Sequence, residues 1–83
     1  MIIFGNIFME NEIKKIFFEV FPSLKESDFD WDKNQNDYEN WDSFAQLQLI
    51  TMAEEKFQIE LSLDDAISIT TAKKLLDLVK SHL

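Results

Sequence analysis

The sequence predicts an all-α domain: a small four-helix bundle with three longer helices, one short helix and a long first loop. One Gly and one Pro are too few for a protein built on many tight β-turns. The composition is 46% hydrophobic, which is enough for a core, and apolar residues recur at helical spacing. A chain of 83 residues has room for one core, so we expect a single domain over residues 1–83.

The first helix is predicted from about Ile7 to Phe21. Its apolar residues follow the i, i+3, i+4, i+7 pattern of a helix with one buried face: Ile13, Ile16, Phe17 and Val20. Pro22 has no amide hydrogen and disfavours helical geometry at Phe21, so the helix should end there.

Residues 1–8 are apolar but lack the basic segment and the small-residue cleavage site of a signal peptide. We interpret them as an N-terminal extension, either a continuation of the helix or the product of an upstream start. No run reaches the ~18 apolar residues that a membrane span requires. We therefore expect a cytoplasmic monomer without membrane insertion.

A long loop from Ser23 to Asp42 is rich in Asp and Asn and weakly periodic. A structureless loop of this length is uncommon in a compact domain. Large side chains are spread along it, and they serve either as anchors to the helices or simply as core residues: Leu24, Phe29, Trp31, Tyr38 and Trp41.

The same loop imitates a calcium site. Oxygen-bearing side chains occupy the ligand positions of an EF-hand loop: Asp28, Asp30, Asp32, Asn34, Asn36 and Glu39. However, Lys33 replaces the glycine that the turn needs, and Gln35 replaces the usual apolar residue. We interpret residues 28–39 as a solvated acidic loop and predict no metal site, with a calcium-binding module as an outside alternative.

The second helix is predicted from Ser43 to Phe57. Ser43 is expected to be its N-cap, and Asp42 places a negative charge at the positive end of the helix dipole. One stripe should face the core: Leu49, Ile50, Ala53 and Phe57. A second, partly apolar stripe forms either a docking surface or a contact beneath the loop: Phe44, Leu47, Gln48 and Thr51.

Two further helices are expected. Ser62 and Asp65 have the spacing of a capping box before a short helix that runs to about Ile67. Thr70 or Thr71 should cap the last helix. Its apolar face contains Ala72, Leu75, Leu76, Val79 and Leu83. His82 lies in the final turn with Lys80, which favours a helix-end role over general base catalysis.

Composition and charge exclude several functions. Sixteen acidic residues against eight basic ones give a net charge of −8, which repels nucleic acid and anionic membranes. The absence of cysteine excludes disulfides and thiolate metal sites. Ser43 has no neighbouring base that would activate it, so we predict that the protein is not an enzyme and that this serine is an attachment point.

The motifs from Trp41 to Val79 resemble those of the acyl carrier protein family. Asp42-Ser43-Phe44 corresponds to the Asp-Ser-Leu tripeptide of that family. The downstream pattern continues without a gap, which makes a weak tripeptide signal specific: Leu49, Ala53-Glu54-Glu55, Phe57, Ile59, Leu61, Ala66 and Ile69-Thr70-Thr71.

This resemblance implies a carrier fold in which Ser43 holds 4′-phosphopantetheine. A phosphopantetheinyl transferase would install the group from coenzyme A, and its thiol would carry an acyl or aminoacyl group as a thioester. A loading ligase and a downstream synthase or transferase are then the expected partners. The residues expected to recognise them are Asp42, Phe44, Leu47, Gln48, Glu54 and Glu55.

The chain also departs from the family pattern. Trp41 stands where a small residue is common, and Ala45 and Gln48 replace acids expected on the partner-facing side. We therefore expect a specialised pathway, such as polyketide, amino-acid or surface-polysaccharide modification, over bulk fatty-acid synthesis. The alternatives are a D-alanyl carrier protein, which the Asp-Ser-Phe form resembles, and an unmodified helical protein-binding module.

Overall fold

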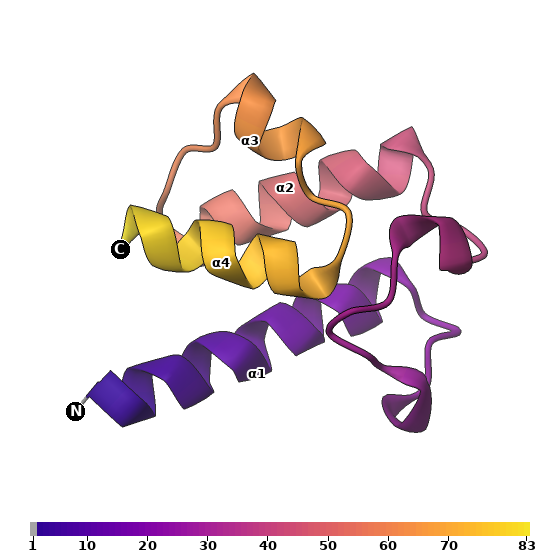
Figure 1. Ribbon diagram of the computed structural model, residues 1–83, viewed down its shortest axis with the longest axis horizontal. Coiled ribbons are helices and arrows are strands. Elements are labelled where there is room, and N and C mark those ends of the chain that lie inside the picture. The colour runs from indigo at the N-terminus through magenta and orange to yellow at the C-terminus, as the bar shows by residue number, and fades with distance from the viewer. Residues whose placement is uncertain (1) are drawn as a thin grey trace.

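The computed structural model describes the backbone from Ile2 to Leu83 and the side chains from Ile7 onward. Four α-helices are present in this part of the chain, with no β-strand (Figure 1): α1 (Ile2–Val20), α2 (Ser43–Phe57), α3 (Leu63–Ile67) and α4 (Ala72–His82). Helix α1 packs against both α2 and α4, and the short α3 lies on the far side of α2 and α4 from α1. The predicted all-α bundle of three longer helices and one short helix is confirmed.

Helix α1 extends further than the periodicity indicated. It begins at Ile2, so the described backbone of the N-terminal extension continues the helix, and it ends at Val20. Phe21 still donates its amide to the Phe17 carbonyl at 2.9 Å before Pro22 breaks the pattern. Ile13, Ile16 and Phe17 are buried as predicted, and Val20 is partly buried against them.

An aromatic cluster holds the long loop against α1. The Phe17 ring lies 5.9 Å from Phe21, 6.0 Å from Phe29, 6.1 Å from Tyr38 and 5.6 Å from Trp41, measured between ring centroids. Aromatic pairs at such separations contribute about 0.5–1.5 kcal/mol each beyond the area they bury. The loop aromatics are therefore anchors and core residues at once, which combines the two predicted roles.

Backbone hydrogen bonds tie the middle of the loop to the start of α4. The Gln35 amide donates to the Thr70 carbonyl at 2.8 Å, and the Lys73 amide donates to the Trp31 carbonyl at 3.0 Å. Two 3₁₀ turns, η1 (Glu26–Asp28) and η2 (Gln35–Asp37), give the loop regular structure of its own. The loop thus connects α1 to α4 and is not structureless (Figure 1).

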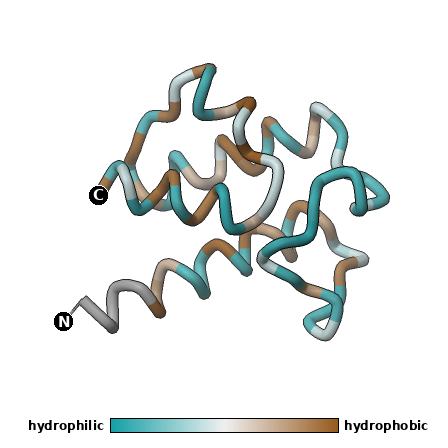
Figure 2. The backbone as a smooth tube through the Cα atoms, viewed as in Figure 1, coloured by the Kyte–Doolittle hydropathy of each residue, from teal (hydrophilic) through white to brown (hydrophobic). Residues whose placement is uncertain are grey.

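Helix α4 supplies the most regular buried face. Thr71 is its N-cap, with its hydroxyl oxygen accepting a hydrogen bond from the Lys74 amide at 3.0 Å. The buried residues are Ala72, Leu75, Leu76 and Val79. Leu83 was wrongly included in this face: the helix ends at His82, so Leu83 lies beyond its last turn and is exposed. Along the described chain, hydrophobic residues recur on the helices while most of the loop is hydrophilic (Figure 2).

A buried carboxylate links α1 to α2. Glu12 is buried, and its oxygens lie 2.9 Å from the Lys56 ammonium and 3.3 Å from that of Lys15. The Lys56 ammonium, with help from Lys15, lowers the pKa of Glu12 despite the opposing effect of desolvation. The charge inside this helix interface is therefore paired.

Tyr38 carries a second buried polar atom. Its hydroxyl is inaccessible to solvent and has no hydrogen-bond partner, while the Lys33 ammonium lies 4.8 Å from the centre of the ring. Burial, and then the charge of Asp30, raises the pKa of Tyr38 to about 12. The aromatic ring of this residue stabilises the loop, whereas its buried, unpaired hydroxyl lowers stability.

We predict that Tyr38→Phe raises the free energy of unfolding at neutral pH by about 1 kcal/mol, because an unsatisfied buried hydroxyl is removed. Since the raised pKa belongs to the folded state, the wild type should lose stability as the pH rises from about 10 to about 12. Denaturant melts across that range should show a shallower loss for Tyr38→Phe. Equal slopes for the two proteins would contradict this account of Tyr38.

Candidate functional site

Ser43 is the first residue of α2, and its side chain is exposed. The N-cap is Asp42, whose Oδ1 accepts a hydrogen bond from the Ala45 amide at 2.9 Å. The prediction that Ser43 caps the helix was therefore wrong by one residue. Asp42 has the extended backbone of a cap, whereas Ser43 already belongs to the helix, so the serine hydroxyl is not used in capping.

Trp41 determines where this segment lies. Its ring packs at 5.6 Å from Phe17, 5.7 Å from Phe21 and 4.9 Å from Tyr38. Trp41 immediately precedes the N-cap, so the aromatic cluster also positions the first turn of α2. A small residue at this position would provide no such anchor.

Gln46, which the sequence patterns did not single out, joins three segments around Ser43. Its Oε1 accepts a hydrogen bond from the Trp41 indole nitrogen. Its Nε2 donates to the Ala66 carbonyl of α3 at 2.6 Å and to the Ile69 carbonyl at 3.1 Å. In the sequence, Gln46 is simply a polar residue one turn before Leu49. This position does not reveal hydrogen-bond partners about twenty residues further along the chain.

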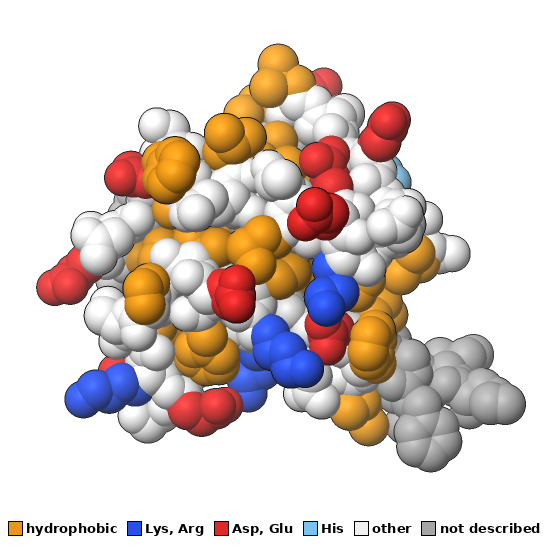
Figure 3. Space-filling model, turned by 180° about the vertical axis from the view of Figure 1, so that it is seen from behind, with side chains coloured by type: hydrophobic (Ala, Val, Ile, Leu, Met, Phe, Trp, Pro, Cys, Tyr) orange, Lys and Arg blue, Asp and Glu red, His pale blue; other side chains and the backbone are white. Residues whose placement is uncertain are grey.

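The outer face of α2 carries exposed apolar side chains next to Ser43. Phe44 is 68% exposed and Leu47 is 59% exposed, so the alternative that they pack beneath the loop is wrong. Viewed from behind, hydrophobic side chains lie open over α2 and α3 with acidic side chains among them, while the lysines in view lie lower, toward α1 and the long loop (Figure 3). This face has the apolar character of a docking surface.

The remaining residues of the predicted recognition set differ in their surroundings. Gln48 is partly buried, Glu55 is exposed, and Glu54 accepts a hydrogen bond from the Leu61 amide at 2.9 Å. Ala45 does not lie on the outer face, because it is buried in the core. The expectation that Ala45 replaces a partner-facing acid is therefore wrong for this position.

A hollow of ≈ 310 Å³ opens beside Ser43. The loop, α2 and α3 each contribute to its lining: Gln35, Trp41, Asp42, Ser43, Gln46 and Ile67. The amides of Ser43 and Phe44 belong to the first turn, where helix geometry leaves them without an intrahelical acceptor. An exposed hydroxyl beside free amides and the positive end of a helix dipole suits a phosphodiester on Ser43.

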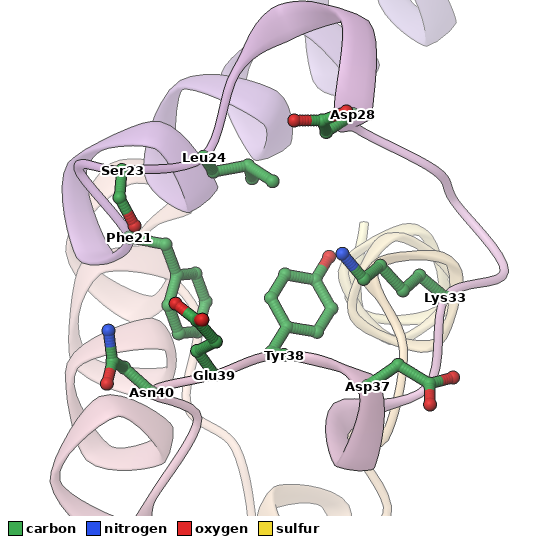
Figure 4. Close-up of a pocket in the computed structure, with 9 residues that line it drawn as sticks. All are labelled: Phe21, Ser23, Leu24, Asp28, Lys33, Asp37, Tyr38, Glu39 and Asn40. Carbon is green, nitrogen blue, oxygen red and sulfur yellow. The ribbon is translucent and has the colours of Figure 1, made fainter.

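A separate hollow lies inside the long loop, remote from Ser43. In Figure 4 the rings of Phe21 and Tyr38 stand next to each other in it, and the Lys33 amine points toward the Tyr38 hydroxyl. Asp28, Asp37 and Glu39 also line it. This hollow contributes nothing to the surroundings of Ser43.

The acidic loop uses its oxygens locally. Asp30 accepts a hydrogen bond from the Asp32 amide, and Asn34 accepts one from the Asn36 amide, each at 2.9 Å. Within the described residues no three acidic or histidine side chains come together as a metal site would require. These contacts are those of a turn-forming loop.

His82 lies at the end of α4, as predicted, away from Ser43. Its Nε2 is 3.3 Å from Asp65 Oδ2, which links α4 to α3. The imidazole, followed by the Ser62 amide, lowers the pKa of Asp65. The predicted capping box is confirmed, because Ser62 and Asp65 each accept a hydrogen bond from the other's amide.

Comparison with protein families matches residues 11–79 to the family described as phosphopantetheine attachment site. The chain belongs to this family. Its members bind a covalently attached 4′-phosphopantetheine group and interact with phosphopantetheinyl transferases and synthases. The chain is thus a phosphopantetheine carrier domain, a kind of domain that is typically not catalytic.

A search of curated proteins finds no match to this carrier domain. None of the helices in the described part of the chain combines the length and hydropathy needed to cross a bilayer.

We predict that Asp42→Ala lowers the free energy of unfolding by about 1 kcal/mol, because the Ala45 amide loses its capping acceptor. Asp42→Asn keeps an acceptor and should lose less than half of that amount. Chemical denaturation of the two variants beside the wild type measures the difference. If both variants lose the same stability, the charge of Asp42 matters more than its capping bond.

Proposed function

We propose that Ser43 is the attachment residue for 4′-phosphopantetheine and that the chain carries acyl or aminoacyl groups as thioesters. One observation carries the proposal: in a chain of this family, the exposed Ser43 hydroxyl stands free at the first turn of a helix. Asp42 has taken over the capping that would otherwise occupy the hydroxyl. Beside it lies open space lined by three segments of the chain.

The chain supplies the acceptor oxygen but no base. In the attachment, Ser43 Oγ forms a bond to phosphorus of coenzyme A, the nucleotide part leaves, and the serine proton passes to the transferase. The first-turn amides and the helix dipole then favour the phosphodiester charge. The attached arm supplies a thiol, which explains thioester chemistry in a chain without cysteine.

Asp42 has a second role in this proposal. Its carboxylate lies next to the serine and makes one bond, to the Ala45 amide through Oδ1. The other oxygen is available to the transferase and its metal ion. Asp42 therefore both caps α2 and helps the transferase to engage.

Partners are proposed to dock on the outer face of α2. Phe44 and Leu47 form its exposed apolar part, and Gln48 and Glu55 continue it along the helix. Glu54 has a structural bond to Leu61 as well, so its contribution to recognition is shared with holding the segment before α3. The occupants are the transferase, a loading ligase and a downstream synthase or transferase.

We place the domain, comprising residues 1–83, in a specialised cytoplasmic pathway of polyketide, amino-acid or surface-polysaccharide modification, with a D-alanyl carrier protein as the alternative. The support is the composition of the docking face, where apolar Phe44 and Leu47 lie next to uncharged Gln48. Apart from Asp42, the described residues of this face offer a partner no charge close to Ser43, so the face would complement a basic docking surface less well than a row of acids would. We propose that the chain acts as a monomer and has no catalytic residue of its own.

We predict that the wild type gains one phosphopantetheine when incubated with coenzyme A, magnesium and a broad-specificity phosphopantetheinyl transferase. Ser43→Ala should fold normally, because Ser43 makes no capping bond, and should gain nothing. Intact-mass spectrometry measures both proteins. An arm on Ser43→Ala would refute the assignment of this serine.

A second candidate function is an unmodified protein-binding module, which the exposed Phe44 and Leu47 favour. It predicts partner binding through this face with Ser43 left unmodified. The two functions are separated by the wild-type mass spectrum together with a docking variant. A folded wild type that no transferase modifies, but that loses partner binding on substitution of Phe44, would favour the module.

We predict that Phe44→Glu raises the KM of the transferase for the carrier about tenfold or more, because an apolar docking contact is replaced by a charge. The loss of stability should be small, because this side chain is 68% exposed. Phe8→Glu is the matched control: Phe8 is 56% exposed on α1, away from Ser43. Steady-state kinetics with each carrier variant as the substrate measure the effect. Equal KM values for the two variants would show that the α2 face is not the docking surface.

A further inference from the structure

Helix α3 is held to the bundle chiefly by hydrogen bonds. It has only five residues, and its large apolar side chains are exposed: Leu63 by 79% and Ile67 by 68%. Buried Ile69 anchors the segment that follows it. An element with so little buried apolar surface depends on specific polar contacts for its position.

Three polar contacts connect this region to α2 and α4. The Leu61 amide donates to Glu54 before α3 begins, and Asp65 meets His82 at 3.3 Å on the exposed side. The third contact is that of Gln46, which reaches both Ala66 within α3 and Ile69 beyond it. Of these three, only the Gln46 contact lies beside Ser43.

The Gln46 side chain uses both halves of its amide. The amide oxygen accepts a hydrogen bond from the Trp41 indole N–H, and the amide nitrogen donates to the carbonyls of Ala66 and Ile69. Trp41 is itself fixed in the aromatic cluster, so its bond to Gln46 anchors the glutamine to the loop. The bonds from Gln46 to Ala66 and Ile69 then connect this anchor to α3. Among the common side chains of this length, only glutamine combines one acceptor with two donors.

The consequence appears at Ile67, one residue after Ala66. Ile67 and Ser43 line the same hollow, although they come from different helices. Gln46 lines it as well, and its bonds to Ala66 and Ile69 flank Ile67 on both sides in the sequence. Of the polar contacts of this region, the one made by Gln46 is therefore the one that ties Ile67 to the turn of α2 that carries Ser43.

We propose that Gln46 is a positioning residue that fixes the end of α3 beside Ser43, so that partners meet Phe44 and Ile67 as one preformed apolar surface around the serine. This proposal rests on the proposed function of Ser43. Preformed surfaces bind more tightly because less conformational freedom is lost on association. The transferase must reach the serine hydroxyl before any group can be loaded, so it is the first partner that binds this surface.

Gln46→Glu tests the proposal most directly. The glutamate keeps an acceptor for Trp41 but places a carboxylate against the carbonyls of Ala66 and Ile69, so it should release α3 and retain the loop bond. Gln46→Met, of similar size, is the second variant and removes all three bonds without adding a charge. Gln58→Leu is the matched control, because it deletes a side-chain bond to the Glu55 carbonyl at the opposite end of α2.

The first measurement uses nitrogen-15 NMR spectra of the proteins before modification. In Gln46→Glu, the amide signals of residues 66–70 should shift, while the Trp41 indole proton should stay at the downfield position of a hydrogen-bonded group. In Gln46→Met, both sets should shift. In Gln58→Leu, neither should. Unchanged signals for residues 66–70 in the two Gln46 variants would overturn the proposal.

The second measurement is the kinetics of phosphopantetheine transfer with coenzyme A. Both Gln46 variants should raise the KM for the carrier about tenfold, with kcat within about twofold, because the lost contact organises docking and not the reacting atoms. Equal loss of kcat and kcat/KM, or a KM like that of Gln58→Leu, would overturn the proposal. A wild type that takes up no arm would contradict the assignment of Ser43, whereas the NMR spectra test the Gln46 contacts separately.

Discussion

The packing of loop aromatics on Phe17 is the interaction on which the rest of the structure depends. Without it, the polar segment between α1 and α2 would be restrained only by two short 3₁₀ turns and a few backbone hydrogen bonds, and it could adopt many conformations. With it, Trp41 has a fixed place, the N-cap at Asp42 follows directly, and Ser43 emerges at a defined point of the surface. The core and the proposed attachment site at Ser43 are therefore coupled through Trp41.

The bundle combines two kinds of stabilisation. Helices α1, α2 and α4 share buried apolar faces and one paired buried charge at Glu12. Helix α3 contributes little apolar area and relies on polar contacts at its ends and beside Ser43. The net charge of −8 is not concentrated at the site, where Asp42 is the one charged residue lining the described hollow. Under the proposed function, recognition there would depend mainly on shape and apolar contact.

Periodicity and capping rules predicted the helices well because these signals are local. The stop at Pro22 and the capping box of Ser62 belong to this class. Local signals were insufficient where two good N-cap residues are adjacent, as at Asp42 and Ser43. Starting the helix one residue earlier or later leaves the spacing of its apolar residues unchanged. They also could not reveal Gln46, whose partners in and beyond α3 are brought close only by tertiary packing. Exposure of Phe44 depends likewise on whether the loop reaches it.

The bonds between the loop and α4 have a consequence for the kinetics of folding. Gln35 pairs with Thr70, and Trp31 pairs with Lys73, so both bonds join residues that are far apart in the sequence. Closing such long chain segments costs entropy, whereas each helix forms from neighbouring residues on a much shorter timescale. The final path of the loop therefore depends on contacts of large sequence separation with both α1 and α4. The loop that leads to Ser43 is therefore expected to form more slowly than the helices, because its contacts with Phe17 and with the start of α4 join distant parts of the sequence.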